Sequence, residues 1–213
     1  MATKAADALL HWILAQHPQL SYGSISGNLC TDKKVSAVNG LLGRGKSDVA
    51  DLEIPADLCQ KRLHVSPKTL AQLSYQKNWV GSQLAGSIRS ANAHIANLLL
   101  ATYLATGQDA ANIVEGSQGF THAEDRGDSL YFSVTLPNLI VGTIGNGKDH
   151  PFVRQNLQQL GCDQETSDGL NSHKLAIIIA ATVLCGELSL LAAQGNPGEL
   201  MRSHLLLERQ QKT

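Results

Sequence analysis

The sequence predicts an α+β fold, with a long central helix and further helices around a modest set of mixed strands. The strongest observation is a helical spacing of apolar residues, in steps of three and four, over residues 81–106. Two segments bounded by turn residues, 47–55 and 128–145, carry the residue types that favour strands. Helices and strands do not alternate regularly, as they would in a parallel α/β protein. With 213 residues, 43% of them hydrophobic, the chain can bury a sizeable core in one or two domains.

The first 25 residues predict one helix and one strand. Apolar residues share a face over residues 5–16, and Pro18 ends the helix that they predict. The next segment, QLSYGSIS at residues 19–26, is expected to form a short strand. One helix and one strand are too little for a core of their own, so we expect the chain to begin partway through a structural unit.

Three elements are expected before the central helix. A helix capped by Thr31 or Asp32 should end at Gly43. The strand at residues 47–55 follows, and then a helix over residues 66–76 with a proline in its first turn.

The central helix and three later elements complete the expected fold. Small side chains in residues 81–106 would let another backbone approach that helix closely. Residues 128–145 are expected to form a strand pair interrupted at a Pro-Asn pair. A helix at residues 171–194 should end at GNPG, and a last helix should cover residues 199–210.

Composition and charge exclude several classes of protein. A net charge of −1 and scattered cations leave no basic surface for nucleic acid or an anionic membrane, and only 4% of residues are aromatic. The most apolar run, residues 175–185, is too short to span a membrane, and the N-terminus has no secretory signal. The four cysteines show neither CxxC pairs nor a metal-like spacing with histidine. We therefore expect a reduced, soluble, cytoplasmic protein without a bound metal.

The segment SGNLCTDKK places charge in a region otherwise suited to packing. Lys33 and Lys34 fall at the start of a predicted helix, where unpaired N–H groups favour an anion, and Asp32 offsets their charge. The pattern fits either an anion-binding site or a solvated pair of lysines.

Other polar positions are candidates, each with a structural alternative. Asp109, in GQDAAN, is either a functional carboxylate or the cap of the next turn. His94 and Asn97 share a face of the predicted central helix and are either ligand-binding or satisfied core groups. His204, beside Ser203, is either a general acid or a surface histidine, and no GxSxG motif supports a hydrolase.

The loop GTIGNG, residues 142–147, follows an expected strand but has the spacing GxxGxG, and no apolar helix opens directly after it. It is a weak match to a phosphate-binding loop, so Gly142 and Gly145 are weak candidates for cofactor contacts.

Seven strings along the chain stand in a specific order and spacing: SGNLCTDKK, GRGK, NWVGSQLAGS, NAHIANLLLATYLATGQDAAN, GTIGNG, GELSLLAA and RSH. In these strings the chain resembles the biosynthetic, class I type of hydroxymethylglutaryl-CoA (HMG-CoA) reductases. The resemblance extends from residue 1 to about residue 210, and the DKK and GQDAAN motifs together are its most specific part.

The resemblance implies three regions. Residues 1–25 would be the trailing helix and strand of an incomplete small, ferredoxin-like domain that binds NADPH. Residues 26–36 would be the substrate and catalytic loop, and residues 37–213 the C-terminal part of a large domain that binds the CoA substrate. Active sites at a dimer interface, and hence a homo-oligomer, are implied as well.

The resemblance also implies a reaction, the reduction of 3-hydroxy-3-methylglutaryl-CoA to mevalonate and CoA by two NADPH, without a metal. Lys33 would be the catalytic lysine that stabilises the developing oxyanion. Asp109 would hydrogen-bond this lysine and tune its proton affinity, and His204 would protonate the departing CoA thiolate.

Further residues match the family's binding positions. The loop that grips the glutaryl end of the substrate would include Ser26, Asn28, Asp32 and Lys34. The polar network around the reacting carbonyl would include Lys77 and Asn97. The residues near the CoA portion would be His94, Ser189 and Ser203.

The chain departs from the family pattern in several places. It has no counterpart of the catalytic Glu in the family's Glu-Asn-Val stretch, nor of the cofactor signature Asp-Ala-Met-Gly-Met-Asn-Met. In the glycine-rich loop, Asn146 and Lys148 replace a Gly and a Thr, and Gln210 stands where some members have a phosphorylatable Ser.

Two hypotheses about function follow. In one, the chain is part of a reductase whose upstream half is encoded separately or was lost through a misplaced start. In the other, it is a module that binds CoA thioesters or forms dimers, or an inactive remnant. In both cases we expect the chain alone not to oxidise NADPH with HMG-CoA at a useful rate. A hydrolase using Ser203 and His204 is a weaker third alternative.

Overall fold

The computed structural model describes residues 2–145, 147–164 and 169–207. The chain divides into two compact units, Met1–Thr31 and Asp32–Thr213. Two residues discussed above for their departure from the family pattern, Asn146 and Gln210, lie outside the described residues.

The first unit contains helix α1 (Ala2–Gln16), which confirms the predicted helix. The strand predicted at residues 19–26 was wrong, because this segment has no regular structure. Here the Ser24 hydroxyl donates to the main-chain oxygen of Ser26 over 2.9 Å. Such local bonds satisfy the main chain where no neighbouring strand does so. A ferredoxin-like origin for this unit stays a prediction.

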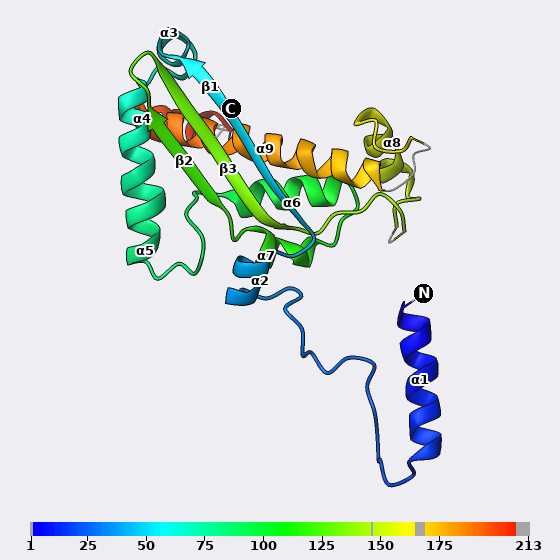
Figure 1. Cartoon of the computed structure of the whole chain (residues 1–213). Helices are drawn as coiled ribbons and strands as arrows, with labels where there is room; N and C mark the ends of the chain where they lie inside the picture. Colours follow the sequence, from blue (N-terminus) through cyan, green and yellow to red (C-terminus); the bar gives the residue numbers. More distant parts are fainter. Residues whose placement is uncertain (1, 146, 165–168, 208–213) are drawn as a thin grey trace. The chain divides into compact units, whose positions relative to one another are not determined.

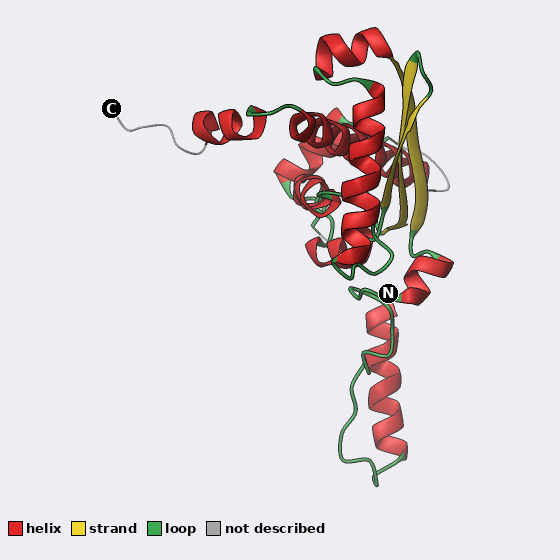
Figure 2. Cartoon of the chain, turned by 90° about the vertical axis from the view of Figure 1, so that its left-hand side faces the viewer, coloured by secondary structure: helices red, strands yellow, loops and turns green. Residues whose placement is uncertain are grey.

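The second unit is built on a three-stranded antiparallel sheet of order β1-β3-β2. The strands are β1 (Lys46–Pro55), β2 (Phe120–Asp125) and β3 (Ser129–Leu139). Residues along β1 alternate between half-buried and exposed, so one face of this strand packs inward and the other meets solvent. In Figure 2 the sheet is seen nearly edge-on, with most helices on one side. The α+β class is therefore confirmed, with strands that are antiparallel to one another.

Most helices of this unit lie on the inward side of the sheet, whereas the last one projects away from it. The longer ones are α4 (Pro67–Ser74), α6 (Ile95–Ala105), α8 (Pro151–Gln159), α9 (Leu170–Gly195) and α10 (Glu199–Leu207). The short ones are α2 (Ala37–Leu42), α3 (Ala56–Leu58), α5 (Ser82–Leu84) and α7 (Ile113–Gly116). Two π-helical turns, η1 (Cys59–Leu63) and η2 (Tyr75–Gly81), and one 3₁₀ turn, η3 (Ala110–Asn112), join them. In Figure 1, α6 and α9 run behind the sheet, where α9 packs on β1 and β3.

The core lies between this sheet and α9. Its fully buried side chains include Phe132 from β3, Leu99 and Tyr103 from α6, and Ile179 and Leu191 from α9. Each apolar side chain of this size contributes roughly 1.5–3 kcal/mol by leaving water. Glu115 is the exception among the large fully buried side chains, and it belongs to the site described below.

Helix α9 confirms the helix predicted at residues 171–194. It is the one described helix that is long and apolar enough to cross a membrane by length and composition, and its most apolar 18-residue window has a mean hydropathy of 2.3. The eleven-residue run read from the sequence therefore understated the apolar length of this helix. Since 56% of its most apolar window is buried inside the protein, packing against the sheet accounts for its apolar character.

The central helix predicted at residues 81–106 was wrong in extent. The chain leaves helical geometry after α5, with left-handed φ angles of 79° at Gly86 and 51° at Arg89. Ala91 then pairs with the sheet, because its N–H donates to Gly119 and its carbonyl accepts from Thr121. The helical spacing is confirmed for α6 alone, and His94 stands at the N-cap of that helix rather than inside it.

The strand pair predicted at residues 128–145 was also wrong. Its first part is the single strand β3, which continues through Pro137, and its antiparallel neighbours are β1 and the unpredicted β2. The proline is tolerated because pairing with β2 reaches only Thr135 and pairing with β1 is irregular at this point. The other predicted elements, β1, α4 and the described part of α10, are confirmed.

The helix predicted from Thr31 starts later than expected. Its N-cap is Ser36, whose hydroxyl accepts from the N–H of Val38, and it ends at Gly43 as predicted. Lys33 has a φ of 56°, in the left-handed region that a continuing α-helix does not contain. Lys33 and Lys34 therefore precede α2, and the prediction of lysines at a helix N-terminus was wrong.

Candidate active site

The central contact of the candidate site joins Lys33 and Asp109. The ammonium of Lys33 lies 2.8 Å from Oδ2 of Asp109, and both side chains are about half exposed (44% and 46%). Asp109 is also the N-cap of η3, since its Oδ1 accepts from the N–H of Ala111 over 3.0 Å. Both readings of Asp109 from the sequence, a cap and a partner for lysine, therefore describe the same carboxylate.

A second contact holds the main chain of Lys33. Its N–H donates to Oε1 of Glu115 over 3.2 Å. Glu115 lies in α7, six positions after Asp109, and its side chain is fully buried. One short segment thus contacts both the side chain and the main chain of the same lysine.

Asp32 and its partners surround this pair. The carboxylate of Asp32 accepts from Arg44 over 2.9 Å and from the side-chain amide of Asn112 over 3.1 Å. The same amide donates to Oε1 of Glu115 over 2.7 Å. Nε of Arg44 lies 3.7 Å from Oε1 of Glu115. The ammonium of Lys34 donates to the main-chain oxygen of Asp32, so these groups form one network.

Pairing shifts the pKa values of the charged groups. The hydrogen bond and charge of Asp109 raise the pKa of Lys33, and Lys33 in turn lowers the pKa of Asp109. Partial burial acts to raise the pKa of Asp32, but its hydrogen bonds to Arg44 and Asn112 outweigh this and lower it. At neutral pH the site therefore presents a protonated lysine beside ionised carboxylates. A half-exposed ammonium held in this way is suited to stabilise negative charge that develops on an oxygen.

Several predicted binding residues lie outside this network. Ser26 and Asn28 belong to the first unit, and their place beside Lys33 stays a prediction. The side chains of Lys77 in η2, Asn97 in α6 and Ser189 in α9 are exposed.

His94 has a definite structural environment at the start of α6. The N–H groups of Ala93 and His94 donate to the two oxygens of Glu187, over 2.9 and 2.7 Å. Nε2 of His94 lies 3.0 Å from the carbonyl oxygen of Gly186, so this nitrogen carries the proton and donates it. His94 therefore donates two hydrogen bonds to α9, one from its main-chain N–H to Glu187 and one from its ring to Gly186.

Ser203 and His204 lie in α10, the former half-buried and the latter exposed. In Figure 2 the last helix before the C-terminus projects away from the sheet and the helices packed on it. In the described part of the chain α10 packs against α9, and the roles given to Ser203 and His204 stay predictions.

The glycine-rich loop is tied to the segment before Asp109. The side-chain amide of Gln108 accepts from the N–H of Gly142 over 2.9 Å and donates to its carbonyl over 3.0 Å. Gly145 has a left-handed φ of 75°. The buried Lys148, whose pKa is lowered by burial, donates to the carbonyl of Gly107. The main chain of Gly142 and the ammonium of Lys148 are therefore hydrogen-bonded to other groups of the protein.

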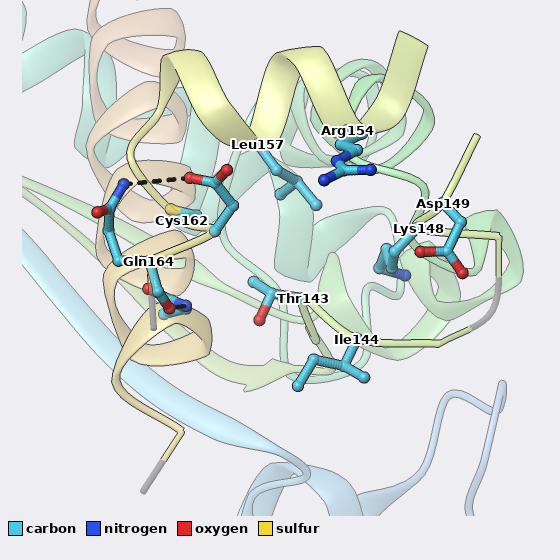
Figure 3. A pocket seen from close by; sticks show the side chains of 10 residues that line it. Thr143, Ile144, Lys148, Asp149, Arg154, Leu157, Cys162 and Gln164 are labelled. Atoms are coloured by element: carbon cyan, nitrogen blue, oxygen red, sulfur yellow. Dashed lines mark hydrogen bonds between the residues drawn. The ribbon is translucent and has the colours of Figure 1, made fainter. Parts of the chain in front are cut away.

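A hollow of about 310 Å³ lies beside this loop (Figure 3). Its charged lining consists of two cations, Lys148 and Arg154, and two anions, Asp149 and Asp163. The charges in its described lining balance, so it lacks the positive excess that favours the phosphates of a dinucleotide.

Four residues of the site and its support were not found from the sequence, namely Arg44, Asn112, Glu115 and Glu187. Arg44, Asn112 and Glu187 stand in GRGK, GQDAAN and GELSLLAA, strings that carry the family resemblance without indicating a role for these three residues. Glu115 and Glu187 are single carboxylates within apolar stretches, NIVEG and LCGELSLL. Because carboxylates are seldom buried without partners, their position in such stretches was a usable signal.

Comparison with known proteins places the chain in a family. The sequence profile named "Hydroxymethylglutaryl-coenzyme A reductase" matches residues 1–209. Proteins named 3-hydroxy-3-methylglutaryl-coenzyme A reductase are similar to it. The one from Pyrococcus horikoshii is 44% identical over 211 residues, which cover 98% of this chain and 51% of that protein. The one from Aeropyrum pernix is 48% identical over 187 residues, covering 87% of this chain and 44% of that protein.

A plant relative shows the same relation. The 3-hydroxy-3-methylglutaryl-coenzyme A reductase 1 of Oryza sativa subsp. indica is 42% identical over 216 residues, covering the whole of this chain and 40% of that protein. The chain thus spans about half the length, or less, of the relatives it matches. On the profile match and these identities, the chain belongs to the hydroxymethylglutaryl-coenzyme A reductase family.

Proposed function

We propose that this chain carries the thioester-polarising part of a mevalonate-pathway reductase, which reduces 3-hydroxy-3-methylglutaryl-CoA to mevalonate and CoA with two NADPH. The observation that carries this proposal is the 2.8 Å contact between Lys33 and Asp109, in a chain that belongs to the reductase family. An ammonium on a family-matched loop, held by a carboxylate, is the arrangement that oxyanion stabilisation requires.

Lys33 would donate a hydrogen bond to the carbonyl oxygen of the thioester, and its charge would stabilise that oxygen as it becomes negative. Asp109 keeps the lysine protonated, because its carboxylate raises the pKa of Lys33. Asp32 and Lys34 would contact the glutaryl carboxylate and hydroxyl from the adjacent loop. His204 would protonate the leaving thiolate. Since α10 projects away from the sheet and the helices packed on it, a site shared between two copies in a homo-oligomer is part of the proposal.

The described residues do not by themselves form a dinucleotide site. Gly142 is engaged by Gln108, Lys148 is engaged by Gly107, and the adjacent hollow has balanced charge. The use of NADPH is therefore proposed on family membership alone. A cytoplasmic location is likewise a proposal, supported by the packing of α9 in the core.

A chimera tests the reductase assignment. The region of the Pyrococcus horikoshii relative that this chain matches, about half of that protein, is replaced by this chain. NADPH oxidation with HMG-CoA is then followed by absorbance. We expect turnover in the chimera, and a loss on the order of 10²–10³-fold in kcat for Lys33→Ala, as for removal of other oxyanion-stabilising donors.

A matched control is Lys68→Ala, an exposed lysine on α4 that should leave kcat unchanged. Full activity in the Lys33→Ala chimera would refute the assignment of the lysine. A folded chimera that binds HMG-CoA but does not oxidise NADPH would favour the alternative function, a module that binds CoA thioesters without reducing them.

A further inference from the structure

We propose that Glu115 is a positioning residue, which holds Lys33 in the conformation that presents its ammonium to Asp109. The role of Lys33 in catalysis rests on the proposed function, whereas the positioning itself is a property of this chain. Glu115 is fully buried, and its Oε1 accepts from the main-chain N–H of Lys33, a residue 82 positions earlier.

The conformation of Lys33 needs such support. Its φ of 56° lies in the left-handed region, which lysine rarely adopts because its Cβ crowds the main chain. A residue in this region persists where surrounding contacts fix it. The bond to Glu115 fixes the main chain of Lys33, and the contact with Asp109 fixes its other end.

The other side-chain contacts of Glu115 are made through the same oxygen. Its Oε1 accepts from the side-chain amide of Asn112 and lies 3.7 Å from Nε of Arg44. Its Oε2 has no hydrogen-bond partner in the described part of the chain. A buried carboxylate is costly, and here a single oxygen receives the contacts from the Lys33 and Asp32 loop and its neighbours. The residue is therefore placed to serve that loop rather than the core around it.

The position of Glu115 relative to Asp109 in the chain also supports a positioning role. Asp109 and Glu115 lie on one continuous segment made of η3 and α7. The two groups that hold Lys33 are thus fixed relative to each other by helical hydrogen bonds. Such an arrangement holds the ammonium in place before a substrate arrives, which is how a charged group stabilises a transition state without reorganisation.

Two conservative variants of the full chain separate contact from charge. Glu115→Gln keeps Oε1 as an acceptor, places an amide where Oε2 has no partner, and removes the charge. Glu115→Asp keeps the charge but is one methylene too short to reach Lys33 from the same backbone. Positioning predicts that the first retains the Lys33 contacts and the second loses them.

Two measurements on Lys33 report the outcome. The first is hydrogen exchange of its main-chain amide, which should accelerate about tenfold in Glu115→Asp and stay near wild type in Glu115→Gln. The second is the rate of acetylation of its side chain at about pH 9, relative to Lys68 and followed by mass spectrometry. Loss of the contact with Asp109 leaves more neutral amine, so acetylation should be several-fold faster in Glu115→Asp.

Glu187→Gln is the matched control, because Glu187 is also buried and also accepts main-chain N–H groups, but of Ala93 and His94. It should lower the melting temperature without changing either reading at Lys33. The proposal is overturned if folded Glu115→Asp shows wild-type rates of amide exchange and acetylation at Lys33, or if Glu187→Gln raises these two rates as much as Glu115→Asp does.

If Glu115→Asp does not fold, the result for Glu115→Gln decides. Faster exchange of the Lys33 amide in Glu115→Gln would then overturn the proposal. Neither measurement needs turnover, so an inactive chimera would not affect this result.

Discussion

Lys33 and Asp109 meet in partly exposed surroundings, and their pKa shifts decide over which pH range the contact contributes to stability. The pKa of Asp109 is lowered by Lys33, so its contribution is present above the unfolded value of about 3.9 and is lost as pH falls through the folded pKa. The pKa of Lys33 is raised by Asp109, so its contribution is present below about 10.4 and is lost as pH rises through the folded pKa.

The first prediction uses Asp109→Asn, which removes the charge but keeps a side-chain oxygen to cap Ala111. Thermal melting should show a small difference from wild type that is constant between about pH 5 and about pH 10 and shrinks outside that range. The difference is small because the pair is half exposed and screened by solvent. A difference that grows as pH falls from about 5 to about 3 would contradict the assigned signs.

The second prediction at the residue scale concerns the contribution of Arg44 to stability. It donates to Asp32 and lies beside the buried Glu115, so Arg44→Leu leaves both carboxylates without this cation. We expect a loss of roughly 1.5–3 kcal/mol in the free energy of unfolding, as for lost hydrogen bonds to charged groups. The measurement is urea denaturation.

Arg126→Leu is the control for Arg44→Leu, since Arg126 pairs with two exposed carboxylates, Glu53 and Glu124. Exposed pairs contribute about 0–1 kcal/mol, so this variant should stay close to wild type. Equal losses in the two arginine variants would show that the buried Glu115 adds nothing to the importance of Arg44.

At the scale of elements, the chain shows where periodicity succeeds and where it fails. The helix predicted at residues 171–194 and the strand predicted at residues 47–55 are confirmed as α9 and β1, and in both the buried positions recur with the period of the element. The helix predicted over residues 81–106 failed at Gly86 and Arg89, where the chain turns so that Ala91 can pair with the sheet. That pairing is a long-range contact, and residue spacing does not encode it.

The start of α6 depends on a carboxylate from α9, which gives the prediction at this scale. In Glu187→Ala the N–H groups of Ala93 and His94 lose both acceptors. We expect a loss of about 1–3 kcal/mol in stability, since the start of α6 loses its capping carboxylate and two partly buried donors are left unsatisfied. Hydrogen exchange should accelerate at these two amides first. A stability loss without faster exchange there would place the role of Glu187 elsewhere.

At the scale of the whole molecule, the candidate site was only partly predictable. Lys33 and Asp109 were identified through the resemblance of short strings to a family, whereas local spacing left both undecided between site and surface. Glu115 and Arg44 were missed because their importance comes from contacts between the loop at residues 32–34 and segments far along the chain. Such contacts depend on how the sheet brings its flanking segments together.

At this scale we predict that the stability of the second unit depends on the packing of α9 against the sheet. Ile179 is 1% exposed and belongs to the core, so Ile179→Ala should cost about 2–5 kcal/mol through lost burial and the cavity left behind. Ile177, on the same helix, is 61% exposed, and Ile177→Ala should change stability by about 0.5 kcal/mol or less. Denaturant unfolding of both variants checks this, and equal effects would contradict the packing of α9 described above.

The length of the segment from Asp109 to Glu115 sets the directions of these two side chains relative to each other. Because each helical residue advances the direction of a side chain by about 100°, one inserted or deleted residue between them would turn Glu115 away from Lys33 while Asp109 stayed where it is. Substitutions at the intervening positions change the chemistry of the segment but not its length. The number of residues in this stretch is therefore as much a part of the site as the identity of the two carboxylates at its ends.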